Sequence, residues 1–119
     1  MNDLDSLVDP APLRRLRSDF GGDETVQNRF VNDFVALWQT RENRLETALA
    51  VADLDDADIV LLSIRSSSHM LGAVRLEKIA GRLHNTVKNR DLPGCRQQLP
   101  GLCEVGTETC WALSQSIAS

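Results

Sequence analysis

The chain has 119 residues, a length that suits one domain with a core of its own. Its net charge of −4 argues against a nucleic-acid surface, and no segment approaches the ~18 consecutive apolar residues of a membrane span. The three cysteines are odd in number and too few for a disulfide framework, so we expect reduced core side chains, among them Cys103 and Cys110. We therefore expect a single cytoplasmic domain over residues 1–119, with neither nucleic acid nor a membrane as a partner.

The N-terminal part of the chain predicts a short helix followed by a long one. Residues 1–9 are expected to be flexible, and Pro10 and Pro12 suit the first turn of the short helix, which the glycines at 21–22 end. Asp23 can cap the long helix, which reaches about residue 52. The apolar face of this long helix is formed by Val26, Phe30, Phe34, Leu37, Leu45 and Ala48.

The third helix is predicted between Asp53 and Gly72. Aspartates in its first turns favour the positive end of the helix dipole, and glycine can adopt the left-handed conformation of a C-cap. Spacings of four and three give this helix an inward face made of Ala57, Leu61, Ile64, Ser68 and Leu71.

Two more helices complete the predicted fold. The fourth is expected to end at Pro93 and Gly94, and its inward face comprises Ala73, Leu76, Ala80, Leu83 and Val87. The last has an inward face of Leu99, Cys103, Gly106, Cys110, Leu113 and Ile117. Because no segment shows the alternation of a strand, we predict an all-α, antiparallel up-down four-helix bundle with a short N-terminal capping helix.

The outward stripe of the third helix contains one apolar side chain among polar ones. It comprises Asp58, Leu62, Arg65, Ser66 and His69. Leu62 and His69 are seven residues apart, so they share a face at a separation of roughly 10 Å. Isolated exposed leucines are common in soluble proteins, and periodicity alone gives Leu62 no role.

The sequence L-S-I-R-S-S-S-H-M-L-G-A, from Leu62 to Ala73, resembles a motif of the histidine-containing phosphotransfer (HPt) domains of phosphorelays. That motif has the form H-x-[LI]-[KR]-G-[SA]-[SA]-x-x-[LV]-G-A. The segments before and after it also resemble the family, and the likeness fades only in about the last twenty residues. The resemblance implies a helical bundle without a cofactor, an expected monomer, and a receiver domain of a response regulator or a histidine kinase as partner.

Two residues depart from the family motif. Leu62 stands where the family has its phosphorylated histidine, and Ser66 stands where it has glycine. In the family, an imidazole nitrogen attacks the phosphoryl group of a receiver's aspartyl phosphate. Leucine has no lone pair, so transfer at position 62 is excluded by composition. The resemblance implies that Arg65 can still steady phosphoryl charge.

Three functions remain open. The first is a docking module that is not itself phosphorylated, which binds a receiver domain or histidine kinase through Asp58, Leu62, Arg65, Ser66 and His69, here called the docking face. The second is active phosphotransfer with His69 as the acceptor. The third is a scaffold for an unrelated partner. If Leu62 replaces a histidine of a parent protein, that parent is an ordinary relay protein.

The remaining histidine and the tryptophans suggest no further site. We expect His84 to be solvated or hydrogen-bonded at the surface, and Trp38 and Trp111 to lie in the core or at its margin. The histidines and cysteines lack the spacings of a metal site, so no metal is expected. No catalytic dyad or phosphate-binding loop is present, and we do not expect an independent enzyme.

Overall fold

Four long helices make up most of the part of the chain that the structure describes. The computed structural model describes residues 7–12, 14–15 and 24–117. Its helices are α3 (Glu24–Ala50), α4 (Leu54–Leu71), α5 (Val74–Lys88) and α6 (Leu92–Ile117). Within those ranges there is no strand, and none of the four helices combines the length and apolar composition that crossing a membrane requires.

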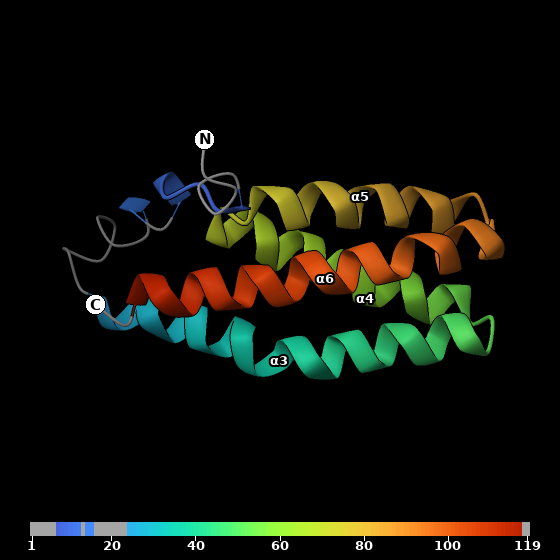
Figure 1. Ribbon diagram of the computed structural model, residues 1–119, viewed down its shortest axis with the longest axis horizontal. Helices are drawn as coiled ribbons and strands as arrows, with labels where there is room; N and C mark the ends of the chain where they lie inside the picture. Colours follow the sequence, from blue (N-terminus) through green and yellow to red (C-terminus); the bar gives the residue numbers. More distant parts are fainter. Residues whose placement is uncertain (1–6, 13, 16–23, 118–119) are drawn as a thin grey trace.

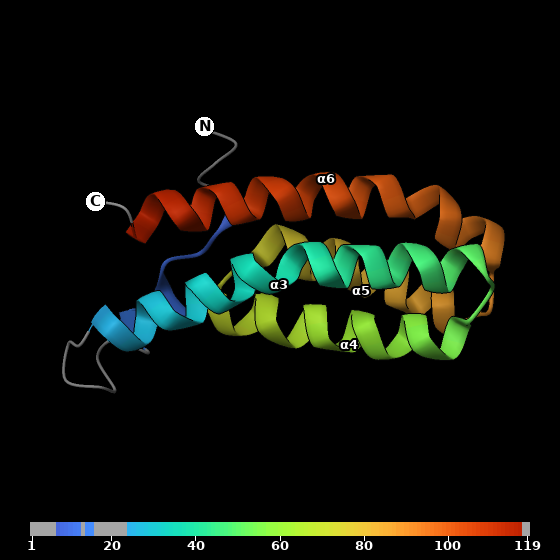
Figure 2. The same cartoon turned by 90° about the horizontal axis from the view of Figure 1, so that it is seen from below.

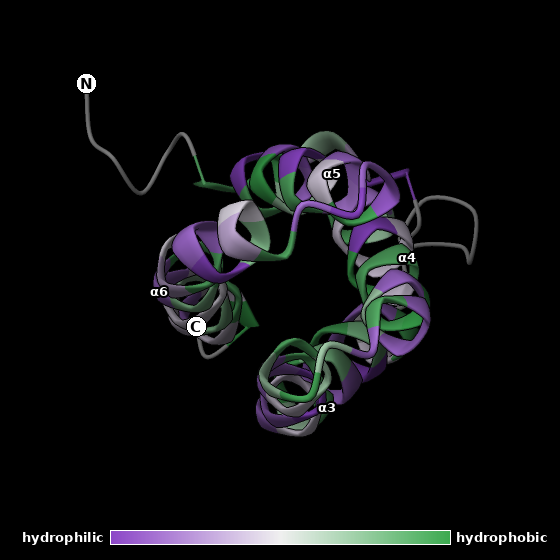
Figure 3. Ribbon diagram, turned by 90° about the vertical axis from the view of Figure 1, so that its right-hand side faces the viewer, coloured by the Kyte–Doolittle hydropathy of each residue, from purple (hydrophilic) through white to green (hydrophobic). Residues whose placement is uncertain are grey.

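The helices run antiparallel and close into a ring. Each helix packs against the next in the chain, and α6 returns to pack against α3 (Figures 1 and 2). A view along the bundle shows the four helices around a common centre (Figure 3). The predicted all-α, up-down four-helix bundle is therefore confirmed.

The inward face predicted for α4 is buried as expected, and the inward face predicted for α5 is buried as well. Trp38 is also in the core, where it packs so closely on Gly106 that an added Cβ there would lie 1.7 Å from its Cζ2.

Three side chains predicted to lie in the core or at its margin are exposed instead: Trp111 is 53% exposed, Leu37 is 46% exposed and Phe30 is 36% exposed. Phe30 and Leu37 keep helical spacing with the buried Phe34 but line an open depression between α3 and α4. The residues three and four positions from Trp111 are exposed or only partly buried, so Trp111 lies on an outward face of α6. The inward face predicted for α6 is right only in part, because Gly106 and Leu113 are buried but its other members, Leu99, Cys103, Cys110 and Ile117, are only partly buried.

Helix α4 ends at Leu71 with Gly72 as its C-cap, as predicted. Gly72 has a φ of 73°, and an added Cβ would lie 2.1 Å from the backbone oxygen of Asp9. The amide of Asp9 donates to the carbonyl of Gly72 at 2.6 Å, and Leu7 is buried. Residues 7–12, here called the N-terminal segment, are thus fastened to the α4–α5 turn. Residues 1–6 of the expected flexible start, residues 13 and 16–22 of the expected short helix and its glycine end, and the predicted cap Asp23 lie outside the described residues.

The boundary between α5 and α6 differs from the prediction. Pro93 and Gly94 do not end α5, which stops at Lys88, but lie in the first turn of α6. Proline is favoured there because it lacks the N–H that a first turn leaves unpaired. The carboxylate of Asp91 accepts a hydrogen bond from the amide of Gly94 at 3.0 Å. The residues that indicated the end of one helix therefore begin the next.

Candidate functional site

Leu62 lies near the middle of α4 with 55% of its surface exposed. It lines a shallow depression of about 400 Å³, here called the Leu62 depression. The other lining residues are Arg65, Ser66, His69, Met70 and Glu77. Four of the five residues predicted for the docking face therefore meet in one place, while Asp58 lies outside the lining.

Asp58 is connected to Arg65 through a histidine of the facing helix. The imidazole of His84 on α5 forms a hydrogen bond with Asp58 Oδ1 through Nε2, and its Nδ1 lies 2.9 Å from Nη1 of Arg65. A guanidinium can only donate, so Nδ1 accepts from Arg65 and Nε2–H donates to Asp58. This assignment uses both ring nitrogens of the neutral side chain.

The prediction that His84 lies at the surface was wrong, because only 2% of the residue is exposed. A signal for its burial was present in the sequence. His84 follows Ala80 by four residues and precedes Val87 by three, which is the spacing of the inward face. A buried polar ring needs hydrogen-bond partners, and α4 supplies them.

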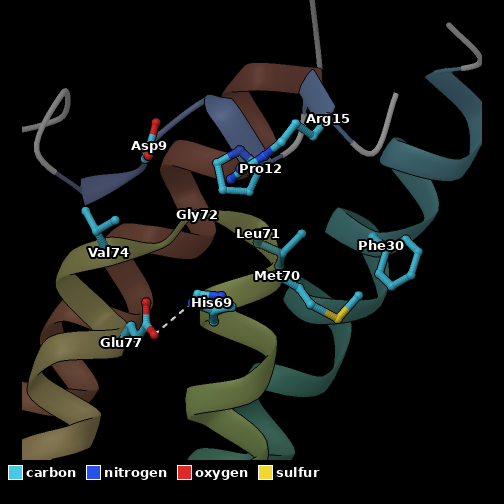
Figure 4. Close-up of a pocket in the computed structure, with 10 residues that line it drawn as sticks. All are labelled: Asp9, Pro12, Arg15, Phe30, His69, Met70, Leu71, Gly72, Val74 and Glu77. Carbon is cyan, nitrogen blue, oxygen red and sulfur yellow. Dashed lines mark hydrogen bonds and ion pairs between the residues drawn. The ribbon is translucent and has the colours of Figure 1, made fainter. Parts of the chain in front are cut away.

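His69 has the opposite environment. Its side chain is 77% exposed, and its Nδ1 lies 3.0 Å from Oε2 of Glu77 on α5 (Figure 4). Nδ1–H donates to that carboxylate, which orients the ring. Within the described part of the chain, Nε2 of His69 has no partner, so this nitrogen is accessible from solvent.

Two more depressions adjoin the Leu62 depression. One, of about 420 Å³, is drawn in Figure 4 and is lined by residues of the N-terminal segment together with Phe30, His69 and Glu77. Another, of about 170 Å³, lies between α3 and α4 and includes Phe30 and Leu37. Met70 lines all three, so they form one continuous surface. Sequence reasoning confined to α4 missed the contribution of α3.

A separate cluster lies between α3 and α6. The possible ligand atoms of Glu42, Glu46 and Cys103 all lie within 4.8 Å of one another. Burial, together with a hydrogen bond to Glu42, raises the pKa of Cys103 to about 12, so the thiol is protonated at neutral pH. The search for metal-ligand spacings within one segment missed this cluster because the three residues come from two helices. None of the three residues lines the Leu62 depression.

Comparison with known proteins identifies the family and the fold. The family model described as "Hpt domain" matches residues 29–117. The chain is similar in structure to histidine-containing phosphotransfer protein B (HptB) from Pseudomonas aeruginosa PAO1, with a TM-score of 0.83 and 18% sequence identity. That likeness covers 92% of this chain and 93% of the other. A search of curated proteins found no significant match.

Proposed function

The chain belongs to the Hpt domain family of phosphorelay modules, and we propose that it acts as a docking module that receives no phosphoryl group at position 62. The observation that supports this proposal is Leu62 itself: the motif places it where the family has the acceptor histidine, and 55% of its surface is exposed. A leucine cannot form a phosphoryl–nitrogen bond. It can bury apolar surface against a partner, and interface energy is concentrated in such central contacts.

Hpt domains interact with receiver domains and histidine kinases, so the proposed partner is one of these. The apolar surface around Leu62 continues over Met70 to Phe30 and Leu37, which are all at least one-third exposed. Arg65 adds a positive charge at the edge of this surface. A module of this kind would compete with a relay protein for its partner, or sequester that partner, without carrying phosphate.

A second candidate function is phosphotransfer at His69. The observation that favours it is the bond from Nδ1 to Glu77, which leaves the lone pair of Nε2 directed to solvent. In that reaction Nε2 attacks the phosphorus of an aspartyl phosphate, the bond from phosphorus to the carboxylate oxygen breaks, and the aspartate leaves. The proton on Nδ1 stays with the ring and faces Glu77. The position of His69, about two helical turns from Leu62, would require a different docking pose.

Phosphoryl transfer from a panel of radiolabelled phospho-receivers separates these functions. The unmodified protein is compared with Leu62→His, His69→Ala and the double variant Leu62→His/His69→Ala. We expect label only on the two proteins that carry histidine at 62. Label on the unmodified protein that disappears in His69→Ala would overturn the proposal and establish His69 as the acceptor.

Docking is measured separately as the affinity for the same receivers and for histidine kinase domains. We expect Leu62→Ala to weaken binding about tenfold, because a central apolar contact is lost. Val51→Ala serves as a matched control, since Val51 is 68% exposed in the turn after α3. If neither Leu62→Ala nor Arg65→Ala affects binding, the proposal that the docking face binds the partner is overturned. That result would favour a scaffold for an unrelated partner.

A further inference from the structure

Arg65 is held against the facing helix by two contacts. Its Nη1 donates to Nδ1 of His84 at 2.9 Å, and its guanidinium lies over Gly81. A Cβ added at Gly81 would lie 3.7 Å from Nε of Arg65 and 4.0 Å from its Cζ. The guanidinium therefore lies close to the α5 backbone at Gly81, where a methyl group would fit but a longer side chain would displace it, and the Arg65 side chain reaches from α4 across to that helix.

His84 is itself fixed from the opposite direction. Its Nε2 is hydrogen-bonded to Asp58, and the ring is buried. Asp58 and Arg65 are seven residues apart on α4, with Leu62 between them, so the hydrogen bonds that link Asp58, His84 and Arg65 connect the two sides of the stretch that carries Leu62. A ring held at both nitrogens cannot rotate without breaking one of the two bonds.

Among the described residues, Arg65 forms no direct ion pair in this arrangement, because the carboxylate of Asp58 is reached only through the ring of His84. In the described ranges Arg44, Arg75 and Arg90 each form an ion pair with a carboxylate, whereas Arg65 forms none. An imidazole that accepts through Nδ1 anchors the guanidinium without neutralising it, and Glu77, the acidic residue that lines the Leu62 depression, is bound to His69. Arginine carries more N–H donors than the one that His84 uses.

We propose that His84 is a positioning residue, which holds the guanidinium of Arg65 on Gly81 so that its remaining donors and its charge are presented to an anionic group of the docking partner. The group recognised is an oxyanion, a carboxylate or phosphoryl group at the partner's surface, because the planar guanidinium donates to two oxygens at once. This inference rests on the docking function proposed above, and it names the contact that sets the affinity for the partner.

The first test uses the protein alone. Nitrogen-15 NMR of the His84 ring should show a proton on Nε2 and an accepting Nδ1, and the Nδ1 signal should move in Arg65→Ala. Arg82→Ala is the matched control, because it removes the same charge from an exposed position on α5. If the signals of the His84 ring are unchanged in Arg65→Ala, the proposed hydrogen bond from Arg65 to His84 is overturned.

The second test measures affinity for the receivers that bind in the docking experiment. His84→Ala should weaken binding about tenfold, whereas His84→Gln should bind almost normally, because an amide offers the same acceptor and donor. Gly81→Leu should also weaken binding by displacing the guanidinium, while Gly81→Ala should not, since its Cβ would stand at ordinary contact distance. Melting temperatures establish whether each variant is folded. If His84→Ala does not fold, Gly81→Leu provides the test.

Repeating the substitutions in an Arg65→Ala background separates positioning from a purely structural role. If His84 acts through Arg65, His84→Ala should change affinity there by less than about twofold. An undiminished loss in that background, or a His84→Gln protein as weak as His84→Ala, would overturn the inference. If no receiver or kinase binds at all, both the docking function and the role of His84 in docking are overturned. The NMR result then shows only whether His84 binds Arg65 in the protein by itself.

Discussion

The two histidines of this protein lie at the same α4–α5 contact and have the same kind of partner, yet their environments are opposite. His69 on α4 binds Glu77 of α5, and His84 on α5 binds Asp58 of α4. The side chain of His69 is 77% exposed, whereas that of His84 is 3% exposed. A carboxylate orients each ring, so orientation does not distinguish them.

The difference lies in the second ring nitrogen. In His84 it accepts from Arg65 and is closed to any other group, whereas in His69 it faces solvent. A histidine–carboxylate pair therefore indicates reactivity only where the remaining nitrogen is free and accessible. The same pair becomes a structural link when a third side chain occupies that nitrogen.

The largest expected difference between the two histidines is in their chemical modification. Diethyl pyrocarbonate acylates unprotonated imidazole nitrogens, and His69 should react readily because its side chain is 77% exposed. His84 should react at least about a hundredfold more slowly, because the α4–α5 contact must first open. Peptide mass spectrometry at successive times measures both rates in one sample. Equal rates in the folded protein would contradict the closed environment of His84, and urea should abolish the difference.

A second difference is expected in stability. Replacing His84 with alanine should lower the free energy of unfolding by about 2–3 kcal/mol, because Asp58 and Arg65 lose their partner and a cavity forms. His69→Ala should change it by less than about 0.5 kcal/mol, since the exposed pair with Glu77 is well solvated. Urea denaturation of both variants provides the comparison. A His84→Ala protein as stable as His69→Ala would show that the buried link contributes little.

The smallest effect is expected at an exposed pair that serves as a reference for both histidines. Nη2 of Arg44 on α3 lies 2.5 Å from Oδ1 of Asp56 on α4, and the hydrogen bond from Arg44 holds the pKa of Asp56 below its ordinary value. Because the folded-state pKa is lowered, the pair stabilises the fold above the ordinary pKa of aspartate and loses this contribution as the pH falls through the lowered value.

Asp56→Asn should therefore lower the urea midpoint slightly at pH 7 and have a smaller effect at pH 3. Asp55→Asn is the matched control, since it removes a carboxylate from the same first turn of α4, and the ion pair of Asp55 with Arg90, at 3.7 Å, is longer and more exposed. An Asp56→Asn effect that grows toward acid pH would contradict the sign of this linkage.

Periodicity was sufficient to predict much of the fold and part of the candidate site. The inward face of α4, the C-cap at Gly72 and the four-helix bundle are all present. The outward spacing also placed Leu62, Arg65 and His69 around one depression. The burial of His84 had a signal in its four-and-three spacing, but its polar character suggested the surface instead.

The limits of the sequence are clearest at Arg65. The sequence by itself determined that Arg65 lies one turn from Leu62 on an amphipathic helix, because helical periodicity is a local property of the chain. Only the tertiary structure decided that this side chain lies over Gly81 and donates to His84, which is 19 residues away, and that His84 in turn binds Asp58, 26 residues away. Such contacts depend on how two helices are aligned along and around each other. That alignment is set by the packing of the whole core and is not contained in the spacing of residues on either helix.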